Sequence, residues 1–217
     1  DWSSDVCSSD LQLRKMHLAR DNAAAFTLDK MHAMVDRDER QIHSLIRLIE
    51  DMLDVSRIRT GKLSIRPARF DLTQLVRNLL ENFAPQVAAA ESSIQLEAQG
   101  PVEGSWDEFR IEQVVSNLLT NALRYGAKSP VEVRVYSEQG MARIEVRDHG
   151  IGISADNQKR IFQQFERVSA SHVAAGLGLG LFISEQIVAA HSGTIEVESQ
   201  IGEGALFRVC LPLEASL

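Results

Sequence analysis

Several specialised protein classes are excluded by what this sequence lacks. Its 217 residues include only 2 Cys, 5 Pro and 13 Gly, too few for a disulfide framework, a collagen or a Pro/Gly-rich linker. No run of about 18 residues is free of charged side chains, so we expect no membrane segment in this chain. Acidic residues outnumber basic ones, and the net charge of −7 argues against nucleic acid as a partner.

The cysteines and the first residues bear on where the protein works. Cys7 and Cys210 have no metal-ligand spacing, which fits a reducing compartment. No leader of the secretory kind opens the chain, so we expect a cytoplasmic protein. Residues 1–10 contain four Ser and three Asp without helical or strand periodicity, which favours a disordered or non-native leader.

The remaining chain has the composition of a globular protein, with 44% hydrophobic and 24% charged residues, and it divides near Gly61. Residues 11–20 have a helical pattern, and residues 23–58 contain neither Gly nor Pro. The second of these segments has an apolar seam at coiled-coil spacing, formed by Ile42, Leu45, Ile46, Ile49, Met52, Leu53 and Val55. We predict a helical hairpin or coiled coil over residues 11–60 and a second domain over residues 61–217.

Residues 61–217 alternate between strand and helix patterns. Strands are predicted at 62–70 (a sheet edge, because of Pro67), 93–98, 131–136, 141–148, 194–199 and 205–211. Helices are predicted at 71–90, 107–124, 154–165 and from the glycine run at 176–180 to about His191. Asp71 with Gln74 resembles a capping box, and Asp107 and Ser154 are expected N-caps. This order predicts an α+β protein, a two-layer α/β sandwich with mostly antiparallel strands.

The helix predicted at 107–124 has two distinct faces. Its apolar face comprises Ile111, Val114, Val115, Leu118, Leu119 and Ala122. Gln113, Asn117, Asn121 and Arg124 recur at about one-turn spacing and share another face. Asn is a poorer helix former than the Lys and Glu of an ordinary solvated face. Two amide oxygens one turn apart could hold a hard cation such as Mg²⁺, and a plain polar face is the alternative.

Asp148, Gly150 and Gly152 form an Asp-x-Gly-x-Gly pattern at the end of a predicted strand. With Ala155, the glycines match the dinucleotide-binding G-x-G-x-x-A turn, but Asp148 would then lie beside a pyrophosphate. No strand ending in an acidic residue follows at the distance that this turn requires. A carboxylate before glycines is better suited to accept a hydrogen bond from an exocyclic amine, while the glycines let a flat ring approach. An ordinary strand-end turn is the alternative.

A glycine run, Gly176-Leu177-Gly178-Leu179-Gly180, opens the last predicted helix. Glycine-rich backbone at a helix N-terminus can bind phosphate through its N–H groups and the helix dipole. No Lys-Ser or Lys-Thr follows, so this is not a Walker A loop. The small residues at 167–175 suit a mobile lid, and the alternative is a glycine-rich loop without a ligand.

Four motifs follow one another in a specific order. They are Asn-Leu-Leu-Thr-Asn-Ala at 117–122, Asp-His-Gly-Ile-Gly at 148–152, Ile-Phe-Gln-Gln-Phe at 161–165 and Gly-Leu-Gly-Leu-Gly-Leu at 176–181. This order resembles the ATP-binding domain of bacterial sensor histidine kinases, of the Bergerat ATPase superfamily. Residues 192–197 resemble its closing hairpin, and residues 48–58 resemble the end of the second dimerisation helix of these kinases. The resemblance covers about residues 11–213.

The resemblance implies the Bergerat fold and a site for ATP and Mg²⁺. Asp148 would bind the adenine amino group. Asn117 and Asn121 would hold Mg²⁺ against the phosphates, with Arg124 and Tyr125 nearby. The glycine run would form the hinge of the lid on the phosphate side.

Two residues depart from the family pattern close to these positions. Gln113, which with Asn117 and Arg124 would make up the catalytic set, stands where many members have a carboxylate that assists proton removal. An amide is not a strong base. Ala205 follows Gly204 where Ser or Thr is usual, which would remove one hydrogen bond near the nucleotide.

The phosphoacceptor is the larger departure. In the family, a histidine followed by an acidic residue and then a Pro lies in the first dimerisation helix. His17, His32 and His43 have no such neighbours, and the first Pro is Pro67. We therefore expect the first helix to be truncated and this chain to bind Mg-ATP without phosphorylating itself.

The function implied by the resemblance is that of an ATP-dependent protein-histidine kinase of a two-component system. The γ-phosphoryl of ATP would pass to a histidine and then to an Asp of a response regulator, and the intact protein would be a homodimer. Two other classes stay open. One is a Bergerat ATPase of the chaperone or mismatch-repair kind, which activates water with a Glu, although the long helix before Gly61 argues against it. The other is a non-catalytic nucleotide-binding signalling module.

Overall fold

The computed structural model describes residues 16, 27–126, 128–166 and 177–214 of the chain. The chain divides into two compact units, residues 1–49 and 50–217. Helix α2 (Leu28–Arg59) passes through the boundary, so its last turns belong to the second unit. The helix expected at residues 11–20 lies outside the described residues apart from Met16.

The apolar seam of α2 is exposed on this chain. The exposed side chains are those of Ile42, Leu45, Ile46, Ile49, Met52 and Leu53. Val55, near the end of the helix, is partly buried against the core of the second unit. The expected hairpin or coiled coil therefore stays a prediction. Among the described residues, no helix is both long and apolar enough to span a lipid bilayer.

The second unit contains two sheets. The larger has five strands in the order β2-β4-β5-β7-β6, and β1 pairs with β3 in a separate two-stranded sheet. The strands are β1 (Ala68–Asp71), β2 (Ile94–Ala98), β3 (Glu103–Trp106), β4 (Val131–Glu138), β5 (Met141–Asp148), β6 (Thr194–Gln200) and β7 (Gly204–Pro212). Only the β2–β4 pair is parallel among these described strands, which agrees with the prediction of mostly antiparallel pairing.

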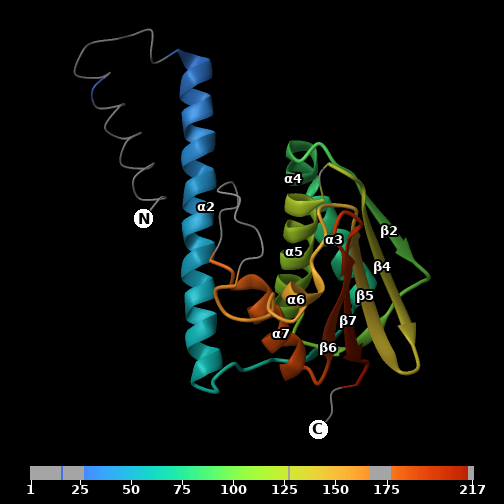
Figure 1. Ribbon diagram of the computed structural model, residues 1–217. Helices are drawn as coiled ribbons and strands as arrows, with labels where there is room; N and C mark the ends of the chain where they lie inside the picture. Colours follow the sequence, from blue (N-terminus) through green and yellow to red (C-terminus); the bar gives the residue numbers. More distant parts are fainter. Residues whose placement is uncertain (1–15, 17–26, 127, 167–176, 215–217) are drawn as a thin grey trace. The chain divides into compact units, whose positions relative to one another are not determined.

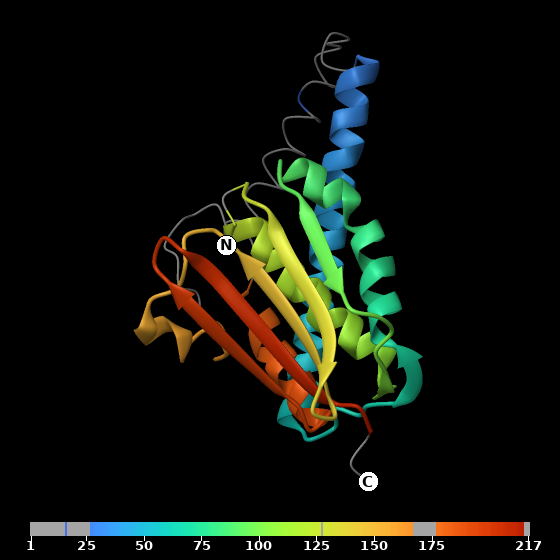
Figure 2. The same ribbon diagram turned by 90° about the vertical axis from the view of Figure 1, so that its right-hand side faces the viewer.

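Helices cover one face of the five-stranded sheet. The helices on this face are α3 (Leu72–Asn82), α5 (Glu108–Tyr125) and α7 (Gly180–Ala190). The short helices α4 (Ala84–Ala89) and α6 (Ala155–Gln158) contain no buried residue. Figures 1 and 2 show α3, α5 and α7 against the same side of the sheet, and contacts with the strands agree. The predicted two-layer sandwich is confirmed.

The core lies between these two layers, because the apolar residues of the strands alternate and those of the helix recur every third or fourth position. Alternate residues of β4 and β5 are buried, as Val133 and Ile144 illustrate. They face the apolar side of α5, where every third or fourth residue is buried, including Ile111 and Leu118. Removing this apolar surface from water contributes roughly 25 cal/mol per Å², so the contact between α5 and the sheet stabilises the second unit.

Two predicted helices differ from those observed. The helix expected at 71–90 is split at Phe83, because Pro85 lacks an N–H and cannot continue α3. The helix expected at 154–165 is limited to α6, and Ser154 makes no side-chain cap. The helix ends at Lys159 and turns follow; further on, Phe165 has a φ of +63° and donates its N–H to the Gly178 carbonyl.

The two-stranded sheet of β1 and β3 also differs from the sequence prediction. The expected strand at 62–70 is confined to β1, which begins after Pro67. Strand β3 was not predicted, because Glu103-Gly104-Ser105-Trp106 has no apolar alternation. The capping box is half formed: Asp71 accepts the N–H of Thr73 at 2.9 Å, whereas Gln74 bonds to another side chain.

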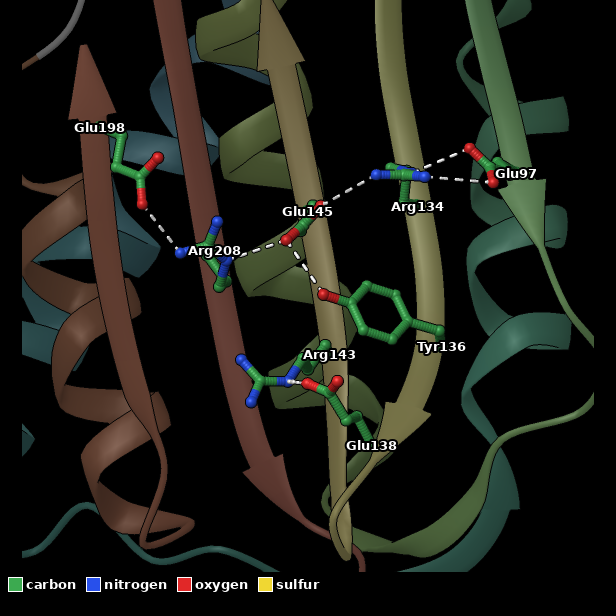
Figure 3. Close-up of polar contacts among 8 residues, drawn as sticks. All are labelled: Glu97, Arg134, Tyr136, Glu138, Arg143, Glu145, Glu198 and Arg208. Atoms are coloured by element: carbon green, nitrogen blue, oxygen red, sulfur yellow. Dashed lines mark hydrogen bonds and ion pairs between the residues drawn. The ribbon is translucent and has the colours of Figure 1, made fainter.

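The uncovered face of the five-stranded sheet has a ladder of alternating charges. Figure 3 shows Glu97, Arg134, Glu145, Arg208 and Glu198, which come from β2, β4, β5, β7 and β6 in turn. Arg134 lies 2.8 Å from Glu97 and 3.9 Å from Glu145. Arg208 lies 2.8 Å from Glu145 and 3.0 Å from Glu198. The ladder therefore links all five strands.

Glu145 is the buried centre of this ladder. Burial alone would raise its pKa, but hydrogen bonds from Arg208 and Tyr136, together with the nearby charge of Arg134, lower the pKa below its ordinary value of 4.5. A carboxyl group with a lowered pKa stabilises the fold above its ordinary pKa. That stabilisation is lost as the pH falls through the lowered pKa.

Replacing Glu145 with Gln should therefore lower the free energy of unfolding by about 1.5–3 kcal/mol at pH 7, the contribution of hydrogen bonds to a charged group. Urea unfolding of both proteins at several pH values measures this. The difference should shrink as the pH falls below 4.5. The control is Glu138→Gln, because exposed Glu138 pairs with Arg143 at 3.2 Å and should contribute less than about 1 kcal/mol. A pH-independent difference would contradict the assignment.

The last turns of α2 are attached to α5 by a buried polar cluster. Asp54 Oδ2 accepts hydrogen bonds from Arg110 Nη1 and Gln113 Nε2, both at 2.8 Å. Arg110 also donates to Gln113 Oε1 at 2.8 Å. The side chains of Asp54 and Arg110 are only 5% and 10% exposed. These three residues, called the Asp54 cluster below, hold the end of α2 against the first half of α5.

Asp54→Ala should cost about 3 kcal/mol of unfolding free energy, because it leaves the Arg110 charge buried without its partner. Urea denaturation monitors the loss, and amide hydrogen exchange should show faster opening of the last turn of α2. Glu103→Ala is the matched control. It removes the exposed Arg69–Glu103 pair, 3.1 Å long, and should cost less than about 1 kcal/mol. Equal losses in the two variants would show that the Asp54 cluster contributes no more than a surface pair.

Candidate functional site

Asp148 is a buried carboxylate at the end of β5. The alternation of β5 places it on the helix-covered face, the same face as Ile144 and Val146. Its Oδ1 accepts the N–H of Gly150 at 2.9 Å. Burial raises the pKa of Asp148, while hydrogen bonds from the backbone of Gly150 and Ala205 act in the opposite direction. The result is an acceptor fixed in direction and shielded from bulk water.

The loop after Asp148 packs against the C-terminal end of α5. A Cβ on Gly150 would collide with the carbonyl oxygen of Tyr125, and Ile151 donates its N–H to that oxygen at 3.3 Å. A Cβ on Gly152 would collide with the carbonyl of Gln200, the last residue of β6. Both glycines therefore fill places where backbone meets backbone. From the sequence we expected glycine here because it lets a flat ring of a ligand approach. The structure gives a different reason, the close packing of backbone against backbone.

Asn117, a residue of α5, lies beside the start of α7. Its Nδ2 donates to Ser184 Oγ at 3.0 Å, and a Cβ on Gly180 would collide with its Oδ1. No described side chain caps the N-terminus of α7, where Leu179 is the N-cap, and its first turn has no acidic residue. The first N–H groups of α7 are consequently available to an anion beside the Asn117 amide.

The glycine run is partly visible. Gly178 has a φ of +70°, a conformation that favours glycine, and Leu177 packs against the core. Gly176 and the expected lid at 167–175 lie outside the described residues.

The remaining predicted residues lie along α5. Asn121 is half-buried, one turn beyond Asn117, and Arg124 is exposed. Gln113, one turn before Asn117, is engaged in the Asp54 cluster with both of its amide atoms. Within the described ranges, no group of three or more His, Cys, Asp or Glu side chains could hold a metal ion by itself. A cation at this site would need amide oxygens together with oxygens of a ligand.

These placements give the site two ends. Asp148 and Tyr125 mark one end, and Asn117 with the N-terminus of α7 marks the other. Tyr125 comes eight positions after Asn117 on α5, about 12 Å at 1.5 Å per residue. An elongated ligand fits this arrangement if one end donates a hydrogen bond and the other carries negative charge.

Sequence reasoning missed residues whose partners are distant in sequence. Ser184 bonds to Asn117, and Asp54 bonds to Arg110. His191 is buried, with Nδ1 donating to the Ile187 carbonyl at 2.8 Å and Nε2 accepting the N–H of Asp107 at 3.0 Å. It ties the end of α7 to the N-cap of α5. The sequence signal at Ser184 was a small polar residue between the apolar residues Ile183 and Ile187 of a largely apolar helix.

Comparisons with known proteins identify the family of this chain. A family model described as histidine kinase-, DNA gyrase B- and HSP90-like ATPase matches residues 106–215. Sensor histidine kinase RppB of Synechocystis sp. is 35% identical over 199 residues, which cover 88% of this chain and 44% of that protein. The chain thus spans less than half of this relative.

Solved structures show the same fold. The crystal structure of full-length ShkA in complex with AMPPNP superposes with a TM-score of 0.73 at 26% identity, covering 88% of this chain and 40% of that one. Histidine kinase AdeS of Acinetobacter baumannii superposes with a TM-score of 0.71 over 94% of each chain, and its 23% identity supports the fold alone. The Bergerat fold is confirmed. This chain belongs to the family of histidine kinase-, DNA gyrase B- and HSP90-like ATPases, with an ATP-binding core of the sensor histidine kinase type.

Proposed function

We propose that this chain is the kinase portion of a two-component sensor, which binds Mg-ATP along α5 and transfers its γ-phosphoryl to a histidine. The observation that carries the proposal is the pairing of two unlike subsites on one helix. A buried carboxylate lies at the end of α5 by Tyr125, and an uncapped helix N-terminus lies beside Asn117. The first suits the amino group of adenine, and the second suits phosphate.

Magnesium fits the donor set at the phosphate end. Asn117 and Asn121 are one turn apart on α5, and amide oxygens are hard ligands of the kind that Mg²⁺ accepts. The cation would complete its shell with phosphate oxygens and water, since Mg²⁺ is commonly held by a few protein ligands plus phosphates. Bound there, Mg²⁺ would neutralise charge on the phosphates.

The protein's share of the transfer is positioning and charge neutralisation. The γ-phosphorus–oxygen bond to ADP breaks as a bond to an imidazole nitrogen forms. Arg124, exposed on the same face as Asn121, would neutralise charge on the phosphates. Gln113 cannot take a proton, and the Asp54 cluster occupies its amide, so we assign it a positioning role.

The wider biological role is proposed on the same basis. The exposed seam of α2, which includes Leu45 and Ile49, would be covered in a homodimer of the intact kinase. The phosphoryl group would pass from the histidine to an Asp of a response-regulator receiver domain. We place this reaction in the cytoplasm, where ATP and response regulators are found.

Nucleotide recognition should depend on Asp148. Asp148→Asn replaces a charged acceptor with a neutral amide that can turn its N–H₂ group toward the adenine amine. Because a charge-assisted hydrogen bond contributes about 1.5–3 kcal/mol, ATP affinity should fall at least about tenfold. Isothermal titration calorimetry measures the affinity, and thermal unfolding without nucleotide checks that the variant is folded. An unchanged affinity would remove Asp148 from the adenine site.

Phosphoryl transfer should be detectable to an acceptor supplied in trans. The chain is incubated with γ-labelled Mg-ATP and a dimerisation-hairpin polypeptide that carries a histidine followed by an acidic residue. We expect acid-labile label on the acceptor. Asn121→Ala should reduce the rate by at least about tenfold, because the cation loses a ligand.

Each other outcome of this experiment identifies a different class. Release of phosphate without labelled protein would favour a hydrolytic Bergerat ATPase. ATP binding without either reaction would favour a nucleotide-sensing module. Both results would contradict the kinase proposal.

A further inference from the structure

Ser184 is a buried hydroxyl on a largely apolar helix. It is 1% exposed, and its buried neighbours on α7 are Ile183, Ile187 and Val188. Burying a hydroxyl without a hydrogen bond is costly. The hydroxyl of Ser184 meets this requirement by accepting a hydrogen bond from Asn117 Nδ2 at 3.0 Å.

This hydrogen bond determines which way the Asn117 amide faces. The two polar atoms of a carboxamide point in different directions, so an Nδ2 that is held by Ser184 directs Oδ1 elsewhere. Oδ1 lies close to Gly180, where a Cβ would collide with it. The oxygen is therefore held at the first turn of α7, whose N–H groups no described side chain caps.

Only one of the two amide orientations can serve a cation. An amide oxygen can coordinate Mg²⁺, whereas an amide N–H₂ group presents hydrogens to it. An unrestrained Asn117 could turn its N–H₂ group toward the cation, and part of the binding energy would be spent on reorienting it. A fixed amide avoids that loss.

We propose that Ser184 is a positioning residue that orients the Asn117 carboxamide, with its oxygen toward the cation of Mg-ATP. This proposal rests on the proposed function, since it concerns the same site. Ser184 acts through Asn117 and does not touch the nucleotide. Gly180 contributes by leaving room for the oxygen.

The test compares ATP binding with and without magnesium. Calorimetry measures the affinities of the wild-type chain and of Ser184→Ala for Mg-ATP, and for ATP with excess chelator. We expect Ser184→Ala to weaken Mg-ATP binding about three- to tenfold, the range for one hydrogen bond, while magnesium-free affinity stays unchanged. Ser184→Cys keeps the volume but bonds weakly, so the magnesium-specific loss should persist. Equal losses with and without magnesium would overturn the proposal and indicate a packing role.

A double-mutant cycle supplies an independent measurement. In an Asn117→Ala background Ser184 has no amide to orient, so Ser184→Ala should cause no further loss of Mg-ATP affinity. Additive losses would overturn the proposal. Failure of the wild-type chain to bind ATP under either condition would instead overturn the proposed function, so the two failures are distinguishable.

Discussion

The packing of the apolar face of α5 against the sheet determines where the residues of the candidate site lie. Ile111, Leu118 and the other apolar residues of that face are fully buried, so the helix cannot rotate without exposing them. With its rotation fixed, its polar residues meet three different partners: Gln113 meets the end of α2, Asn117 meets α7, and Tyr125 meets the loop after Asp148. One hydrophobic contact thus orders polar groups from three parts of the chain.

The two faces of the sheet have separate tasks because strand side chains alternate. Along β5, Ile144, Val146 and Asp148 face the helices, while Glu145 faces the uncovered side. The inner face supplies the core and the candidate adenine carboxylate. The outer face holds the strands together by ion pairs, of which the Arg208–Glu145 contact at 2.8 Å is the best shielded. Because Asp148 is the last residue of β5, its position depends on the sheet staying fixed.

The sequence predicted elements with a strong period and missed contacts between distant residues. The amphipathic pattern of α5, the alternation of β4 and β5, and the order of the glycine motifs were sufficient for the fold, and the site residues that they indicate stay a prediction. The helix predicted at 154–165 was too long, because no Gly or Pro in the local sequence marks its end at Lys159. The partners of Ser184 and Asp54 lie more than fifty residues away, and their pairing depends on how helices pack. The pairing of such distant residues cannot be predicted from the properties of single residues.

The close packing of glycines around the site limits how its specificity can evolve. At Gly150, Gly152, Gly180 and Gly204, an added methyl group would run into backbone atoms or into Asn117. Even the smallest substitution there would displace part of the site before it could offer a new group to a ligand. Heritable changes in ligand preference must therefore arise at positions with room for a side chain. Mutational tolerance around this site should consequently alternate sharply between neighbouring residues.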